Sequence, residues 1–243
     1  MAAAAERSFT VRRTDMSARR RPSHSLALRI SRALEQEYRS ADLGNRTDPV
    51  EELVYIALTR QTHQRNALQS WQAITDAGGP AAILDMSESR LQHLLGPAGL
   101  SRQKARWIKG SLMAVAQRFG ELSLSATRDW ADDALEAFLR SLPGISIKSA
   151  KCIMMYSMGR RVLPVDVHVR RVATRLGLVE KGLSEREIHS ALESQIASGD
   201  RYAFHVNSVW HGRKVCVARN PKCHQCVIQQ LCAFGCSRGD DRA

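Results

Sequence analysis

The chain has 243 residues, with 36 lysines and arginines against 24 aspartates and glutamates, so its net charge is +12. Apolar residues make up 44% of it, which excludes a chain disordered throughout and allows one or two domains with a core. No apolar run approaches the roughly 18 residues of a membrane span, and the start lacks the apolar stretch of a secretory signal. The basic excess points to a polyanion such as a nucleic acid; a basic but merely solvated surface is the alternative.

The first 25 residues are predicted to be a solvated basic tail, because they show almost no apolar periodicity. Such a tail can attract phosphates without sequence preference. Its arginines are Arg7, Arg12, Arg13, Arg19, Arg20 and Arg21. Arginine outnumbers lysine 29 to 7, which is typical of a GC-rich bacterial genome. We therefore expect a cytoplasmic protein associated with the bacterial nucleoid, or an organellar or nuclear protein if the source is eukaryotic.

From Leu26 onward, apolar residues recur at helical spacing, and no segment shows the sustained alternation of a strand. Asp48-Pro49 marks a helix start, because aspartate caps a first turn and proline fits within it. Ser101 opens a long helix that Gly120 ends. The sequence therefore predicts an all-α protein with short loops.

A tight turn within residues 142–148, LPGISIK, separates two helical patterns and predicts a helix–hairpin–helix. The amides of such a turn and the following helix N-terminus suit a phosphate oxygen. Residues 142–175 hold seven cationic side chains and one aspartate, a balance of +6 that is half of the net charge. An ordinary helical hairpin with solvated charges is the alternative on local evidence.

Asp166 precedes a helical pattern that Gly177 ends, so it is predicted to be the N-cap of that helix. Capping keeps a carboxylate ionised, because amide donors stabilise its charged form. The same residue can therefore cap a helix and take part in catalysis.

Four cysteines near the end of the chain are spaced C-x6-C-x2-C-x5-C. They are Cys216, Cys223, Cys226 and Cys232. Four thiolates in a loop-rich stretch can hold a tetrahedral metal or an iron–sulfur cluster. Zinc sites usually pair two short knuckles, whereas this pattern has a single x2 spacing, which favours the larger cluster. Cys236 lies outside the pattern, and Cys152, in an apolar helix, is predicted to be a core residue.

The segments LPGISIKSA and VLPVDVHVRRVATRLGL, with the cysteine pattern, resemble the helix–hairpin–helix DNA glycosylases of the endonuclease III type over about residues 45–235. The resemblance implies two helical domains. One is a six-helix barrel with the hairpin, residues 46–162; the other joins residues 26–45 to 163–243 and holds a [4Fe–4S] cluster. It also implies double-stranded DNA with a damaged base or abasic site as the partner. We expect a monomer with no membrane association.

By motif position, the resemblance assigns the nucleophilic lysine of the family to Lys148 and its catalytic aspartate to Asp166. Gln61 and Leu100 match the residues that fill the duplex where a base has been flipped out, and His168 matches a histidine near the DNA backbone. The other DNA contacts that we expect are Gly144, Ile145, Ser146, Lys151 and Arg170. Attack on the sugar by a neutral amine requires a lowered pKa of Lys148, which we expect either from desolvation or from Lys151 and Arg170 as neighbouring cations.

The chain departs from the family pattern in three places. Ser146 replaces the usual second glycine of the hairpin, which would strain the backbone if that position needs a positive φ. Val167 stands where many members have threonine, and Thr62-His63-Gln64 replaces a more acidic stretch. The segment RVLPVDVHVRRVATRLGLV is also similar to the plant branch that excises 5-methylcytosine. These departures leave the lesion and its opposing base open.

The implied activity is removal of a damaged, oxidised pyrimidine through a lysine Schiff base, followed by β-elimination that nicks the strand. A mismatch or uracil/thymine-type glycosylase on the same fold is the alternative. A non-catalytic iron–sulfur DNA-binding protein is the alternative from another class.

Overall fold

The structure is a computed structural model that describes residues 24–236, and every regular element within them is helical. The α-helices are α1 (His24–Tyr38), α2 (Pro49–Thr59), α3 (Gln64–Asp76), α4 (Gly79–Asp85), α5 (Glu88–Leu94), α6 (Ser101–Phe119), α7 (Asp132–Ser141), α8 (Ile147–Met158), α9 (Val167–Leu176), α10 (Glu185–Gln195), α11 (Arg201–Lys214) and α12 (Ala233–Cys236). Short 3-10 turns are η1 (Gly96–Ala98), η2 (Ser125–Thr127), η3 (Ser198–Asp200), η4 (Cys223–Gln225) and η5 (Gln229–Leu231). The predicted all-α class is confirmed.

The predicted tail lies outside the described residues except for its last two, which belong to α1. None of the described helices is both long and apolar enough to cross a bilayer.

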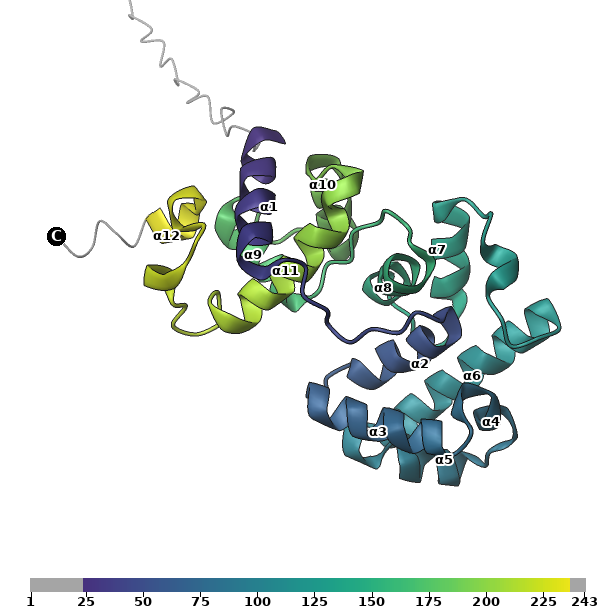
Figure 1. Ribbon diagram of the computed structural model, residues 1–243. Helices are drawn as coiled ribbons and strands as arrows, with labels where there is room; N and C mark the ends of the chain where they lie inside the picture. Colours follow the sequence, from purple (N-terminus) through teal and green to yellow (C-terminus); the bar gives the residue numbers. More distant parts are fainter. Residues whose placement is uncertain (1–23, 237–243) are drawn as a thin grey trace, which may run out of the picture.

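Two separate hydrophobic cores organise the helices (Figure 1). One core is built from α2 to α8 and ends at Val162; the other is built from α1 and the helices that follow Leu163. The chain therefore crosses twice between the two groups, once after α1 and once after α8 (Figure 1). The first core ends at Val162 and the second resumes at Leu163, which is where we predicted the domain boundary. Helix α1 packs against α11, although the two are distant in sequence.

Local capping chemistry explains where the helices begin. Asp48 Oδ1 accepts the amides of Val50 and Glu51, each at 2.9 Å, and Pro49 occupies the first turn of α2 as predicted. Ser184 at the start of α10 forms a reciprocal capping box with the residue three positions later. The barrel contains seven α-helices rather than six, because a new cap at Ser87 divides the stretch after α3 into two seven-residue helices.

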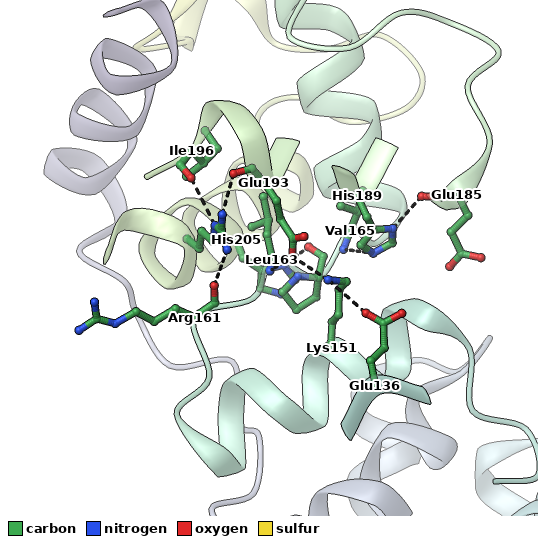
Figure 2. Close-up of polar contacts among 12 residues, drawn as sticks. Glu136, Lys151, Arg161, Leu163, Val165, Glu185, His189, Glu193, Ile196 and His205 are labelled. Carbon is green, nitrogen blue, oxygen red and sulfur yellow. Dashed lines mark hydrogen bonds and ion pairs between the residues drawn. The ribbon is translucent and has the colours of Figure 1, made fainter. Parts of the chain in front are cut away.

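A buried ion-pair network joins the two groups of helices (Figure 2). The Nζ of Lys151, on α8, lies 3.3 Å from Glu136 Oε2 on α7 and 2.7 Å from Glu193 Oε1 on α10. The same Glu193 oxygen accepts the amide of Leu163 at 2.8 Å. Only 7% of the Lys151 side chain is exposed, so the expectation that it contacts DNA is wrong: two carboxylates from different helices hold its ammonium inside the protein.

The crossing between α8 and α9 is fixed by side chains from α10 and α11 (Figure 2). His189 Nε2 accepts the amide of Val165 at 3.1 Å, and His205 Nδ1 lies 2.8 Å from the carbonyl oxygen of Pro164. Arg201 donates to the carbonyl oxygen of Arg161 at 2.6 Å. Because these contacts hold the backbone at Arg161, Pro164 and Val165, the residue that follows has a defined position relative to α8.

Replacing Lys151 with methionine removes the buried ammonium that two partly buried carboxylates share. We expect Lys151→Met to lower the free energy of unfolding by about 3 kcal/mol. Urea unfolding followed by circular dichroism measures the change. The matched control is Arg106→Met, which breaks an ion pair whose side chains are 61% and 48% exposed and should cost less than about 1 kcal/mol. Equal effects of the two variants would contradict a joining role for Lys151.

Candidate functional site

The hairpin turn packs directly onto α6 through Gly144. This glycine has a φ of +76°, and a Cβ added to it would lie 2.5 Å from the ring of Trp107, so no larger residue fits. The Arg60 guanidinium stacks 4.4 Å from the centre of a Trp107 ring and donates to the carbonyl oxygen of Gly144 at 2.5 Å. The hairpin is thereby fixed against the loop that follows α2.

Ser146 serves as a helix cap and carries no backbone strain. Its φ is −85°, and its Oγ accepts the amide of Ser149 at 3.3 Å, so the departure from glycine starts α8 with an ordinary N-cap. The amides of Gly144 and Ser146 have no hydrogen-bond partner among the described residues, which leaves both able to meet a phosphate oxygen. Ile145, which we also expected to contact DNA, has a side chain buried in the core and an amide that donates to the carbonyl oxygen of Leu142.

Lys148 lies in the first turn of α8 and lines the same cavity as Asp166. Burial lowers its pKa, but Cys152, Asp166 and Glu52 outweigh burial and hold the pKa above its ordinary value. The expected lowering by Lys151 and Arg170 is therefore wrong, because Lys151 is already paired with carboxylates. In the free protein Lys148 is an ammonium ion.

Asp166 caps α9, as predicted, and faces Lys148. Its Oδ1 accepts the amides of His168 at 2.9 Å and Val169 at 2.8 Å, and no hydrogen bond within the described chain engages Oδ2. Burial raises the pKa of Asp166, but His205, Lys148 and the Val169 amide together bring it below the ordinary value. The carboxylate is thus held ionised beside the lysine.

A cavity of about 130 Å³ opens beside these two residues, between the two groups of helices. Its wall includes Lys148 and Asp166. The other polar and aromatic side chains that line it are Asn45, Tyr55, Thr59, Thr62, Gln64, Cys152, Tyr156, His205 and Arg213. A wider groove outside it is also lined by Gln61, His168 and Arg170, so five of the ten predicted catalytic and DNA-contacting residues lie along one surface. Cys152, predicted as a core residue, is buried and also lines the cavity.

Three of the predicted DNA contacts have defined surroundings. His168 Nδ1 lies 3.1 Å from Arg171 Nη2 beside α11, and burial lowers the pKa of its ring. Arg170 is exposed and donates to the carbonyl oxygen of Leu183 at 3.1 Å. Leu100, half exposed, does not line the cavity or the groove and lies at the start of α6 instead.

Glu52 is a titratable residue of the site that sequence reasoning missed. It is fully buried on α2, and its carboxylate accepts Asn45 Nδ2 at 2.5 Å and the amide of Arg46 at 2.7 Å. Burial raises its pKa to about 7, although these donors and Lys148 oppose the shift. In the sequence, Glu52 is one of two successive glutamates in the first turn of a helix. Acidic residues are common at that position, so nothing in the sequence indicates that Glu52 is buried.

The four predicted cysteine ligands are half buried and line one cavity between α9, α11 and α12. Arg175, on α9, fastens this loop: it lies 3.3 Å from Cys216 Sγ and donates to the carbonyl oxygens of Val217 and Ala218 at 2.8 and 2.9 Å. The cation nearest the thiols is therefore one that the sequence placed in the catalytic segment, 41 residues before Cys216.

The surroundings of these cysteines fit an iron–sulfur cluster. Burial raises the pKa of the Cys226 thiol to about 11 and that of Cys232 above its usual range, so thiolates here require a bound cation. Four thiols around one cavity suit a cluster of several irons, which would cross-link the loop to the helices beside it.

Comparison with known proteins matches both parts of the chain. The family described as HhH-GPD superfamily base excision DNA repair protein matches residues 54–198, and the iron–sulfur binding domain of endonuclease III matches residues 216–232. Endonuclease III from Sulfolobus acidocaldarius is 29% identical over 180 residues, which are 73% of this chain and 78% of that protein. Endonuclease III from Treponema pallidum is 30% identical over 181 residues, or 74% and 81% of the two chains.

Among solved structures, that of a non-covalent endonuclease III–DNA complex superposes with a TM-score of 0.79 at 24% identity. The superposition covers 90% of this chain and 99% of that one.

The raised pKa of Glu52 predicts a pH-dependent loss of stability. A carboxyl whose pKa rises from 4.5 to about 7 on folding stabilises the fold most below pH 4.5, and that contribution disappears as the pH rises through 7. Wild-type protein should lose on the order of 3 kcal/mol more than Glu52→Gln between pH 4.5 and 8. Urea titrations at both pH values measure this difference. Glu51→Gln, on the same helix and partly exposed, is the control and should keep the wild-type slope. Identical slopes for wild type and Glu52→Gln would contradict the buried assignment.

Proposed function

This chain belongs to the HhH-GPD superfamily of base excision DNA repair proteins and to its endonuclease III family, and from that premise we propose that Lys148 and Asp166 excise a damaged pyrimidine. The observation that carries the proposal is the shared cavity: an ammonium from one group of helices and a carboxylate from the other face the same space. The chain is a bifunctional DNA glycosylase and abasic-site lyase that holds a [4Fe–4S] cluster through its four cysteines.

Extrusion of the target nucleotide is the first step, because a base stacked in a duplex cannot enter a cavity between two domains. Gln61 and Leu100 are the residues that we propose fill the gap. Both are exposed, and both have a φ of +50°, a left-handed conformation that places their side chains on sharp loops. The unpaired amides of Gly144 and Ser146 would hold a backbone phosphate nearby.

Lys148 must lose a proton before it can act as a nucleophile. Asp166 shares its cavity and has an oxygen outside the helix cap, so it is the group that receives the proton, directly or through water. The extruded nucleotide removes water from the cavity, which favours transfer because neutralising both charges avoids their desolvation. After transfer, the Lys148 amine is free to attack.

The covalent steps then follow from the amine. Lys148 Nζ bonds to the sugar C1′ while the bond from C1′ to the base breaks, and the base leaves with its electron pair and takes up a proton. The bond from C1′ to the ring oxygen then opens: the oxygen leaves with the electron pair and takes one of the two protons on the nitrogen, which gives a protonated Schiff base. Loss of a C2′ proton expels the 3′ phosphate, which nicks the strand, and water then releases Lys148. Asp166 passes the proton that it took from Lys148 to the leaving base, and the carboxylate restored in this way stabilises the positive charge that develops at C1′.

Borohydride trapping and single-turnover kinetics distinguish the role of Lys148 from that of Asp166. We expect Lys148→Ala to form no borohydride-trapped adduct on abasic DNA, because Lys148 is the one lysine of residues 24–236 that lines the cavity. Asp166→Asn should slow base release by about 10²–10⁴-fold and still bind DNA, because the amide keeps an oxygen for the helix cap. A full adduct from Lys148→Ala would overturn the assignment of the nucleophile.

A panel of duplexes tests the substrate, with one lesion or mismatch in each. We expect the highest single-turnover rate on an oxidised pyrimidine, because the cavity is small and its lining is polar. A thymine or uracil mismatch as the best substrate would favour the mismatch glycosylase instead. Lys148→Ala assayed on the same panel is the control for background excision.

A further inference from the structure

Lys104 is a completely buried lysine on α6 that the proposed chemistry does not use. Its Nζ donates three hydrogen bonds, at 2.8 Å to the carbonyl oxygen of Leu58, at 2.5 Å to Thr62 Oγ1 and at 2.8 Å to the carbonyl oxygen of Ala98. An ammonium group has three N–H bonds, so all of its donors are satisfied. None of the ion pairs in residues 24–236 includes this lysine.

Two of the three acceptors, Thr62 and Ala98, belong to loop segments that are distant in sequence. Thr62 directly follows Gln61, and Ala98 lies two residues before Leu100. The Thr62 hydroxyl also lies 2.6 Å from the carbonyl oxygen of Ala98, so the loops meet at this point with Lys104 beneath them. Leu58 adds the end of α2, from which the first loop leaves. One buried ammonium thus joins both segments that carry the proposed gap-filling residues.

Both loops need an external restraint. Gln61 and Leu100 each have a φ of +50°, which is unfavourable for residues with a side chain and persists only where surrounding contacts enforce it. An unpaired buried charge is itself costly, and burial together with the charge of Arg60 lowers the pKa of Lys104 to about 8. An apolar side chain would fill this place at less cost but could not bind three loop oxygens.

We propose that Lys104 is a positioning residue that holds Gln61 and Leu100 at a fixed separation, so that both enter the duplex when a base is extruded. The inference rests on the proposed function and adds to it a device for coupling the two loops. It assigns no contact between Lys104 and DNA.

Trapping on two forms of abasic DNA tests the role. A duplex must be opened and filled at the lesion, whereas a single-stranded oligonucleotide with the same abasic site has no gap to fill. We expect Lys104→Met to slow borohydride trapping on the duplex tenfold or more and to leave the single-stranded rate unchanged. Thr62→Val is the milder second variant, because it removes the shared hydroxyl and keeps the lysine. Because Thr62 also lines the cavity, its readout is the ratio of the duplex rate to the single-stranded rate, which should fall as it does for Lys104→Met.

The matched control is Lys109→Met, on the same helix, which removes a lysine that donates to the carbonyl oxygen of Met86 away from both loops. It should leave both rates unchanged. The double variant Lys104→Met with Thr62→Val should be no slower than the slower single variant, because both act on one linkage. Circular dichroism at the assay temperature confirms that each variant is folded.

An equal loss on both forms of DNA, or no loss on the duplex, would overturn the inference. If the Lys104→Met protein does not fold, the comparison of duplex and single-stranded trapping by Thr62→Val alone tests the inference. Absence of trapping by the wild-type protein on either DNA would overturn the proposed function itself, and the inference with it.

Discussion

One carboxylate oxygen sets the geometry on which the site depends. Glu193 Oε1 accepts both the Lys151 ammonium from the barrel and the amide of Leu163 at the start of the second core. Lys151 follows Lys148 by less than one helical turn, and Leu163 precedes Asp166 by three residues. The oxygen therefore fixes, from both sides, the two segments that carry the proposed nucleophile and its carboxylate. Without such a contact, two separately folded cores could move relative to each other, and no cavity of constant shape would exist between them.

Several charged side chains are also buried, and a different set of contacts stabilises each of them. Lys148 is surrounded by groups that favour its ammonium form, Asp166 by amides that favour its carboxylate, and Lys104 by three uncharged oxygens. At the other end of the molecule, Arg175 holds the loop of the cysteine ligands while α9, its own helix, begins at Asp166. The same helix thus connects the cluster to the site, which gives the cluster a structural part in placing the carboxylate.

Much of this organisation could be predicted from the sequence, because it depends on local chemistry or on motif spacing. The side chains of Asp48 and Asp166 accept amides within three residues of them, so these caps depend on the local sequence alone. The spacing of the four cysteines can be read without knowing how the helices pack. The rest depends on contacts across the fold. The sequence suggested that Lys151 binds a phosphate, because its two carboxylate partners lie on other helices and could not be foreseen. It suggested a strained backbone at Ser146, because the role of this residue as a cap depends on where α8 begins. Glu52 and Lys104 became visible only once their burial was known.

The central claim is that the amine of Lys148 forms the covalent bond to the sugar C1′. The most direct measurement is tandem mass spectrometry of the borohydride-reduced adduct between the wild-type protein and an abasic-site oligonucleotide, after digestion of both. The account predicts a single modified peptide whose added mass, the reduced sugar fragment, lies on Lys148. Modification at Lys151, Lys104 or the chain's amino terminus instead of Lys148 would contradict it.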